Sequence, residues 1–185
     1  MPAPDALELT ALLDRFERPL VRYAQSITGD LESARDVVQE TFIKLARGGM
    51  NSSSSEGGDK ARHTEAWLFT VTRNRALDHQ RKFSRIIPME LPEDRPCAAP
   101  GPAAVLEQQE SASALFRLLD ALSPNQREVI RLKFQNDLSY REIAEVTRLS
   151  VTNVGFLLHT GLKKLRALLR EQAPEDFGLT TRSTL

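Results

Sequence analysis

Basic side chains gather toward the C-terminal end of this 185-residue chain, where they could bind phosphate groups. Between Asp120 and Arg170 the chain has nine Lys or Arg and five Asp or Glu residues, an excess of four in a chain of zero formal net charge. Lys163, Lys164 and Arg166 follow an apolar stripe with helical period, and Arg170 follows them. Positive charge beside a helix suits contacts to a nucleic-acid backbone.

A second candidate surface combines an aromatic ring with basic side chains. The stretch 65–82, EAWLFTVTRNRALDHQRK, has the periodicity of a helix, with Leu68, Val71 and Leu77 as its predicted core residues. Bases stack on aromatic rings while cations hold the backbone, so the remaining surface suits single-stranded nucleic acid. Packing of Trp67 into the core is an equally good alternative. The surface consists of Trp67, Arg73, Asn74, Arg75, Arg81 and Lys82.

A third surface is polar and lies on the stretch 30–47, DLESARDVVQETFIKLAR. Asp30 is placed to cap a helix here, and the apolar residues repeat with helical spacing. The predicted buried side consists of Leu31, Ala34, Val37, Val38, Phe42 and Leu45. Taken alone, the opposite face is an ordinary solvated helix surface, formed by Arg35, Asp36, Gln39, Glu40 and Lys44.

The motifs of catalysis are absent from the sequence. No glycine-rich phosphate loop, metal-ligand cluster or nucleophile–base spacing is found. The single cysteine, Cys97, lies in a Pro-rich stretch and is expected to be a surface thiol, and His63, His79 and His159 are too scattered for a metal set. We therefore expect neither an enzyme nor a cofactor.

Two helices joined by a very short turn organise the second half of the chain. Ser139 and Glu142 have the spacing of a capping box, which starts a helix at Tyr140. Ser150 can cap the next helix, from Val151. The pattern is that of a helix-turn-helix, although a tight helical hairpin within a bundle uses the same caps. Ser123 and Pro124 start the helix that precedes this pair, with a predicted core of Val129, Ile130, Leu132 and Phe134.

In the rest of the chain, Pro, Gly and Ser residues interrupt or end the predicted helices. Residues 7–28 are predicted to be helical, with Pro19 kinking the helix or starting a new one and Gly29 ending it. The Gly- and Ser-rich stretch 48–65 is predicted to be a flexible loop. Residues 83–102 contain five prolines and several acidic residues, which is typical of a linker between domains. The expected fold is therefore all-α, with two small helical domains joined by a Pro-rich linker and a helix-turn-helix in the second.

The sequence also indicates a compartment. No apolar run is long enough to span a bilayer, and acidic Asp5 and Glu8 stand where a signal peptide would need basic residues. We expect a cytoplasmic protein without membrane insertion.

Three stretches in order resemble an extracytoplasmic-function (ECF) sigma factor of bacterial RNA polymerase. The segment RYAQSITGDLESARDVVQETFIKLAR resembles the part that docks on core polymerase, and EAWLFTVTRNRALDHQRK resembles the promoter-melting part. The segment LSPNQREVIRLKFQNDLSYREIAEVTRLSVTNV resembles the domain that reads the upstream promoter element. The resemblance implies region 2 over residues 1–84, a linker over 85–104, region 4 over 105–172 and a flexible tail over 173–185.

The resemblance implies a role for each surface of the first domain. Asp36, Gln39 and Glu40 match the face that binds the clamp helices of the largest polymerase subunit. The third helix matches the region that holds the minus-ten element as it melts, where a non-template base flips into a protein pocket. The matching residues are Trp67, Arg73, Asn74 and Arg75.

In the second domain the resemblance places the helix from Val151 in the major groove of the minus-thirty-five element. Thr152 and Asn153 are the best candidates for base contacts, because Asn can pair with adenine and a Thr methyl can touch thymine. Phosphate contacts are expected from Arg141, Lys163 and Lys164. The chain departs from the family's usual Lys, Ser and Arg at Gly155, Phe156 and Leu157.

The resemblance also implies partners: core polymerase, promoter DNA and an anti-sigma factor. One alternative is a transcription regulator that binds DNA alone through its helix-turn-helix, which leaves the first domain without a role. A second alternative is a helical interaction protein that binds no DNA. The apolar run from Phe156 and the zero net charge would suit such a protein.

Overall fold

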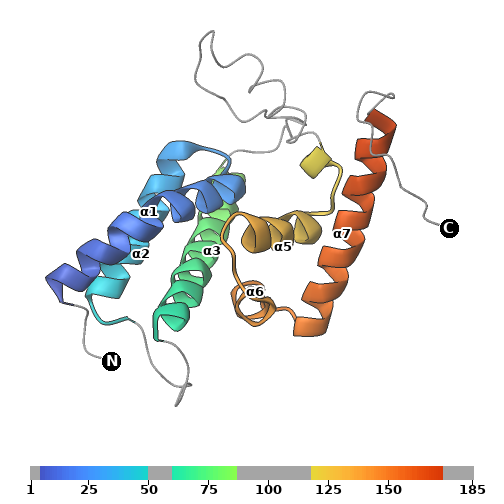
Figure 1. The fold of residues 1–185 in the computed structure, drawn as a ribbon. Helices are drawn as coiled ribbons and strands as arrows, with labels where there is room; N and C mark the ends of the chain where they lie inside the picture. Colours follow the sequence, from blue (N-terminus) through green and yellow to red (C-terminus); the bar gives the residue numbers. More distant parts are fainter. Residues whose placement is uncertain (1–4, 50–59, 87–117, 173–185) are drawn as a thin grey trace, which may run out of the picture.

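The computed structural model describes residues 5–49, 60–86 and 118–172, and within these ranges the regular structure is helical throughout (Figure 1). This agrees with the all-α prediction. The predicted linker lies almost entirely outside the described residues, as do the tail and most of the Ser-rich loop. The helices are α1 (Ala6–Thr28), α2 (Leu31–Ala46), α3 (Lys60–Ile86), α5 (Pro124–Phe134), α6 (Tyr140–Thr147) and α7 (Val151–Gln172).

Helices α2, α5, α6 and α7 begin where their capping residues predict. The Asp30 carboxylate accepts a hydrogen bond of 2.8 Å from the Ser33 N–H at the start of α2. Capping boxes open α5 at Ser123 and α6 at Ser139. The Ser150 hydroxyl accepts from the Asn153 N–H at 3.2 Å and so caps α7. Each cap satisfies a backbone donor that would otherwise lack a partner, so local sequence defines these ends.

The first half of the molecule is a bundle of α1, α2 and α3. Helices α2 and α3 run antiparallel, because Thr41 lies opposite Thr72 while Lys44, one turn further along α2, lies opposite the earlier Trp67. The Thr41 and Thr72 hydroxyls are buried and 3.3 Å apart. The core of this half includes Phe16, Leu20, Tyr23, Val37, Val38, Leu45, Leu68 and Phe69.

The second half consists of α5, α6 and α7. Arg148, Leu149 and Ser150 connect α6 to α7, and Arg148 adopts a left-handed conformation with φ of 60°. This short turn brings the buried Val154 and Leu158 of α7 against the core of the other two helices. The core of this half includes Leu122, Val129, Leu132, Leu138, Ile143 and Val146.

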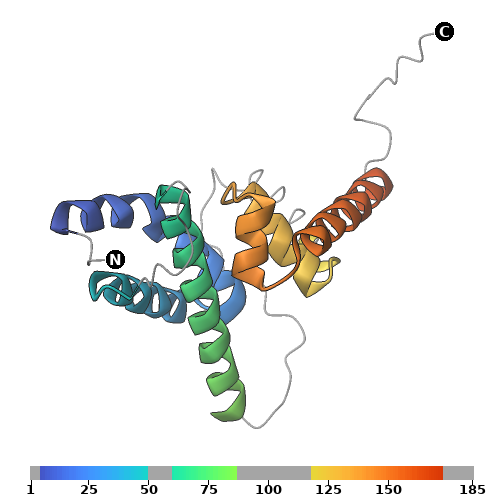
Figure 2. The ribbon, with the colours of Figure 1, turned by 90° about the horizontal axis from the view of Figure 1, so that it is seen from below.

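The two halves pack against each other. Helix α3 lies beside α6 in both ribbon views (Figures 1 and 2), and the two helices are in contact. The buried apolar residues of both halves belong to one cluster. Sequence reasoning left the relative placement of the domains open, since a flexible linker does not specify it.

Several local features refine or differ from the sequence predictions. At Pro19, where a kink or a new helix start was predicted, α1 continues without a new start, and buried Phe16 and Leu20 hold both sides of the proline in the core. Helix α3 begins at Lys60, inside the predicted loop, and ends at Ile86, beyond the boundary predicted at residue 84. Leu31 and Phe134 were predicted to be core but are 42% and 62% exposed, because each is a terminal residue of its helix.

Candidate polymerase and nucleic-acid interfaces

Helix α2 presents the three residues that were predicted to bind polymerase. Asp36, Gln39 and Glu40 are all exposed, and their spacing of three and four residues places them on one face. The Glu40 carboxylate also forms an ion pair with Arg75 of α3. A predicted polymerase residue therefore touches a predicted promoter residue.

An apolar groove runs beside this face, between α1 and α2. It has a volume of about 420 Å³, and Gln39 is one of its lining residues. Ile43, which also lines it, is 42% exposed despite its large apolar side chain. The groove was not predicted from the sequence. Its signal there is the helical spacing of apolar residues in α1, such as Leu9 and Leu13, which line the groove. The other apolar lining residues are Leu9, Leu13, Val21, Val38, Phe42 and Ala46.

The four predicted minus-ten residues lie on two sides of α3. Trp67 is half-buried against the core, and the Lys44 ammonium lies 5.8 Å from the centre of its ring. Arg75 lies on the same side, two helical turns further along α3, and pairs with α2. Asn74 is half-buried. Trp67 therefore packs partly against the core while part of its side chain stays exposed, and its role in a nucleic-acid surface stays a prediction.

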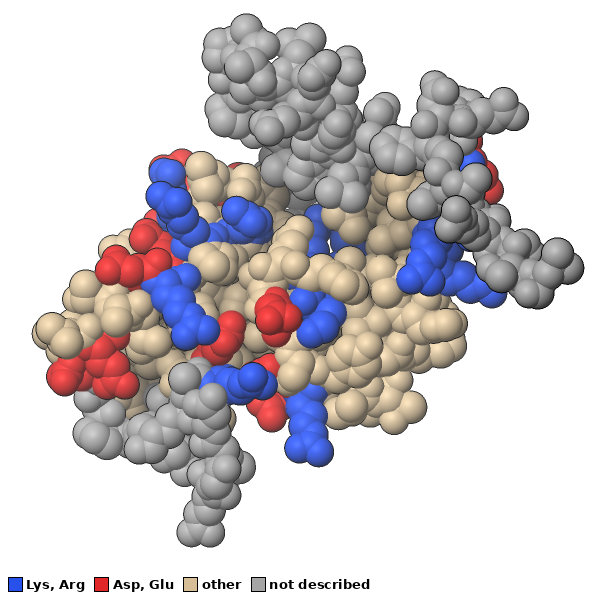
Figure 3. All heavy atoms as spheres, in the orientation of Figure 1, with Lys and Arg blue, Asp and Glu red and all other residues tan. Residues whose placement is uncertain are grey.

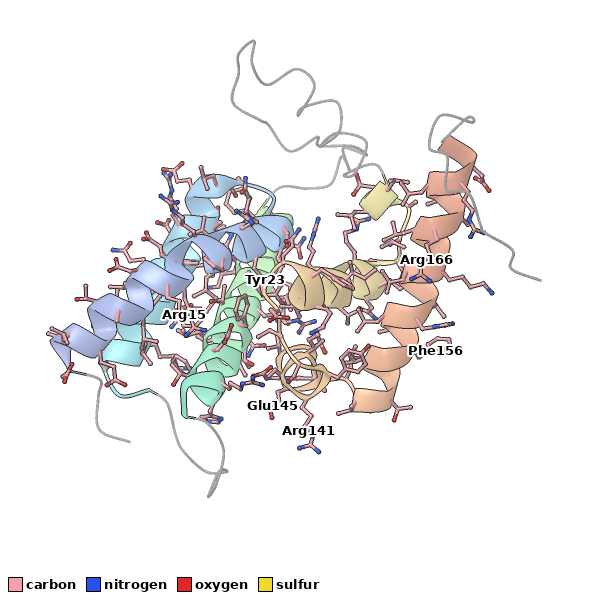
Figure 4. The ribbon with its side chains drawn as sticks, in the orientation of Figure 1. Arg15, Tyr23, Arg141, Glu145, Phe156 and Arg166 are labelled. Atoms are coloured by element: carbon pink, nitrogen blue, oxygen red, sulfur yellow. The ribbon has the colours of Figure 1, made fainter. Side chains whose placement is uncertain are left out.

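Arg73 points instead toward the second half of the molecule. Its Nε donates to Glu128 Oε1 at 2.7 Å and its Nη2 to Glu128 Oε2 at 3.1 Å, a bidentate pair with α5. The Tyr23 hydroxyl of α1 donates to the same Oε1 at 2.7 Å. Figure 4 shows Tyr23 where α1 meets α5. We refer to these three hydrogen bonds as the Glu128 contact.

The ionisation of these groups follows from their surroundings. Burial, followed by the charge and hydrogen bond of Glu128, holds the pKa of Tyr23 well above its usual value, so the phenol stays protonated and donates. The hydrogen bond to Glu128 raises the pKa of Arg73. The Tyr23 ring also meets Phe69 edge to face, with centroids 5.5 Å apart.

The predicted minus-thirty-five residues are exposed on the helix-turn-helix. Thr152 and Asn153 occupy the first turn of α7, and Arg141 lies on α6 (Figure 4). Lys163 is exposed further along α7, where it lines a shallow concavity with His159, Arg166 and Arg170. The Lys164 ammonium donates to the carbonyl oxygen of Ala121.

Gly155, Phe156 and Leu157, where the chain departs from the family's usual residues, have different surroundings on α7. Phe156 is 63% exposed and follows Asn153 by three residues and Thr152 by four, so it shares their face. Leu157 packs against the core, and a Cβ on Gly155 would lie 3.7 Å from the Tyr140 ring. Of the three, only Phe156 has a large side chain on the exposed face that also carries Thr152 and Asn153.

On the face shown in Figure 3, Asp and Glu lie mainly on the left and in the centre, where Lys and Arg are also present. The charged side chains over α7 on the right are mostly Lys and Arg. Within residues 5–49, 60–86 and 118–172 no helix is long and apolar enough to cross a membrane. Over the same ranges, no group of three or more His, Cys, Asp or Glu residues is placed to hold a metal ion.

A three-helix bundle followed by a helix-turn-helix with an exposed helix face is an arrangement typical of helical proteins that bind DNA. The family model for Sigma-70 region 2 matches residues 12–86, and the model for Sigma-70 region 4 matches residues 112–165. The chain is 32% identical to the ECF RNA polymerase sigma factor SigL of Mycobacterium tuberculosis, over 91% of this chain and 93% of the relative. It is 29% identical to SigX of Bacillus subtilis, another ECF RNA polymerase sigma factor, over 89% and 87% of the two chains.

Solved structures are also similar over nearly the whole chain. CnrH in complex with the cytosolic domain of CnrY has a TM-score of 0.60 and 27% identity, covering 91% of this chain and 92% of that one. The sigma factor RpoE of Bartonella quintana, in complex with the anti-sigma factor NepR, shares the fold with a TM-score of 0.57 at 23% identity, covering 89% and 98%. The chain belongs to the ECF sigma factors of RNA polymerase, which direct core polymerase to specific promoters and initiate transcription.

Proposed function

We propose that the chain binds core RNA polymerase through the exposed face of α2 and the groove beside it. Asp36, Gln39 and Glu40 supply acceptors for basic side chains on the clamp helices of the largest subunit. The apolar groove supplies buried area at the centre of the same contact. The observation that carries this proposal is the combination of exposed acidic and amide side chains with an apolar groove on one helix pair.

Promoter DNA is the second partner in this proposal. The melted minus-ten strand is held by Trp67, Arg73, Asn74 and Arg75 of α3. Thr152 and Asn153 read the minus-thirty-five element, and its phosphates are held by Arg141, Lys163 and Lys164. Binding the open strand more tightly than the duplex favours melting by shifting the equilibrium. The chain itself catalyses no reaction in this account.

An anti-sigma factor is the third proposed partner, and the site of action is the cytoplasm. Support comes from the similarity to RpoE, which was solved with the anti-sigma factor NepR. CnrH, which is also similar, was solved with the cytosolic domain of CnrY. The docking of such a partner would compete with polymerase or with DNA for the exposed surfaces of the two halves.

The proposal is tested by co-elution with core RNA polymerase on a sizing column. The parent is expected to co-elute, and Glu40→Arg is expected to lose most of the binding, because it places positive charge against the basic partner surface. Gln39→Glu tests the same face with a smaller change. Glu145→Arg is the matched control, since it makes the same reversal at an exposed glutamate of α6.

Three outcomes of this experiment are informative. Loss of co-elution in Glu40→Arg with retention in Glu145→Arg supports the α2 face. If Glu40→Arg binds as tightly as the parent, the docking surface is wrongly assigned. If the well-folded parent does not co-elute, duplex binding by the chain alone becomes the next measurement.

A further inference from the structure

Phe156 is a large apolar side chain of α7 that the core does not bury. It is 63% exposed, whereas Val154 and Leu158, two residues to either side, are 0% and 2% exposed. Two residues correspond to about 200° around a helix, so the burial of Val154 and Leu158 turns Phe156 to the opposite side. Figure 4 shows Phe156 on the side of α7 that faces away from α5. The packing of α7 itself therefore holds this ring in solvent.

The residues that share this face with Phe156 are of kinds that bind nucleic acid. Thr152 and Asn153 lie about one turn before the ring, and both are exposed. His159 and Lys163 lie about one and two turns after it, and both are exposed. The first turns of the second helix of a helix-turn-helix are the part that enters a major groove. The ring thus lies between two proposed base contacts and a proposed phosphate contact.

Charge and surroundings favour DNA over a protein as the partner of this face. From residue 151 to residue 170 the chain has four Lys or Arg and no Asp or Glu, which suits a phosphate backbone. The centre of a protein interface is usually an apolar patch. Around Phe156, however, positions 152, 153, 159 and 160 all hold polar residues, so the ring stands alone among polar neighbours.

The chemistry of an aromatic ring selects one feature of the major groove. The C5 methyl of thymine is the apolar group that an unmodified base pair presents there. Packing a phenyl ring on this methyl removes apolar surface of both groups from water. The other base edges present hydrogen-bond donors and acceptors, which a phenyl ring cannot satisfy. A ring at this place therefore favours thymine.

We propose that Phe156 is a specificity residue of the minus-thirty-five interface and selects a thymine by packing against its 5-methyl group. Three residues advance about 4.5 Å along a helix and one base pair rises about 3.4 Å, so this thymine lies one or two base pairs from the pair that Asn153 reads. The inference rests on the proposed function, because it requires α7 in the major groove. It adds both a residue and a base preference to that function.

The proposal is tested by removing the methyl group from the DNA. Holoenzyme, formed from the full chain and core polymerase, selects duplexes from a pool randomised at the minus-thirty-five element. Each thymine of the selected element is then replaced in turn by deoxyuridine, which lacks only the 5-methyl and pairs in the same way. Competition against a fluorescein-labelled parent duplex measures binding. Binding is expected to weaken about threefold to fivefold at the thymine that Phe156 contacts, the effect of one buried methyl group.

Four variants assign the effect to a side chain. Phe156→Ala is expected to bind the thymine and deoxyuridine duplexes equally at that position, and Phe156→Leu is expected to keep part of the preference. Thr152→Ser removes the other methyl group on this face and is expected to leave the preference at that thymine unchanged. Leu169→Ala is the matched control, since Leu169 is an apolar residue of α7 that is 52% exposed on a different side of the helix.

Loss of the preference in Phe156→Ala with retention in Leu169→Ala supports the proposal. It is overturned if the parent binds every deoxyuridine duplex as tightly as the thymine duplex, or if Phe156→Ala keeps the parent's ratio at each thymine. Loss of co-elution of Phe156→Ala with core polymerase would also overturn it and assign the ring to a protein interface. A parent holoenzyme that selects no upstream sequence contradicts the proposed function as well, whereas a selected sequence without methyl dependence contradicts this inference alone.

Discussion

At the scale of single residues, the ion pair between Glu40 and Arg75 joins two surfaces that the proposal assigns to different partners. In that proposal Glu40 faces the polymerase and Arg75 faces the melted strand. The pair is partly exposed to water, so its own contribution to stability is small. We expect polymerase binding at Glu40 to break this ion pair and to make the Arg75 guanidinium available to DNA.

Asn153 provides a residue-scale prediction about promoter reading. Its backbone N–H completes the cap on Ser150, so Asn153→Ala leaves the start of α7 intact. The substitution is expected to spare polymerase binding and to relax the preference at one upstream base pair by about 1–3 kcal/mol. The measurement is selection of holoenzyme-bound duplexes from a pool randomised at the minus-thirty-five element.

Lys163→Gln is the control for that experiment. It removes a phosphate contact and is expected to weaken all sequences about equally, reducing the salt slope by about 0.9. An unchanged base preference in Asn153→Ala would show that this side chain reads no base.

Glu65 provides a residue-scale prediction about pH. Burial, with added repulsion from Glu142 and Asp137, raises the pKa of Glu65 above its usual value of 4.5, while Arg15 opposes the shift. A raised carboxyl pKa adds stability that is fully present below the unfolded-state value and is lost as pH rises through the folded-state value. Ionised Glu65 therefore destabilises the fold at about pH 7.

Glu65→Gln is accordingly expected to raise the melting temperature at about pH 7, with the advantage over the parent shrinking as pH falls toward about 4.5. The gain is expected to stay below about 1 kcal/mol, because the ion pair with Arg15 at 3.8 Å is lost as well. Thermal unfolding across this pH range measures it. An advantage that grows as pH falls would mean that the Arg15 pair dominates.

At the scale of secondary-structure elements, caps and turns define the helix ends while packing decides which faces are buried. Helix α7 contains a glycine, Gly155, which faces the Tyr140 ring. Nothing in that contact requires glycine, since a Cβ would lie 3.7 Å from the ring. Glycine inside a helix costs conformational entropy relative to alanine.

Gly155→Ala is therefore expected to stabilise the fold by about 0.5–1 kcal/mol. Gly29→Ala, at the end of α1, is expected to destabilise it by about 1 kcal/mol, because Gly29 has φ of 85°. Urea unfolding of both variants measures the contrast. Equal effects at the two positions would contradict the argument, since it depends on the different backbone conformations.

At the scale of the whole molecule, the two halves share a buried apolar cluster and the ion pair between Arg73 and Glu128, yet they match separate family regions. Because the proposed function places the two halves on different promoter elements, we expect them to separate on binding. The free energy of binding to polymerase and DNA would then offset the loss of the contacts between the halves.

Energy transfer between dyes attached at Ala11→Cys on α1 and Ala167→Cys on α7, in a Cys97→Ser background, tests this expectation. When the labelled parent is bound to core polymerase, we expect the high-transfer population of the free chain to be replaced by a low-transfer population. A holoenzyme that kept the high-transfer state would show that the halves remain together during function.

The sequence by itself determined the helices and their order, because caps such as Ser123, Ser139 and Ser150 act within a single turn and apolar spacing reports one buried face per helix. It also indicated the helix-turn-helix and the exposed face of α2. Terminal residues such as Leu31 and Phe134 were wrongly placed in the core, since periodicity does not show where a neighbouring helix ends.

Only the tertiary structure decided which charged side chains face solvent and which face each other. Arg73 and Arg75 are two residues apart in the chain, but one pairs with Glu128 of α5 and the other with Glu40 of α2. Glu128 lies 55 residues from Arg73 and 105 residues from Tyr23 along the chain, so no local pattern could reveal these contacts. Long-range contacts of this kind depend on how the helices pack, and packing is a property of the whole chain.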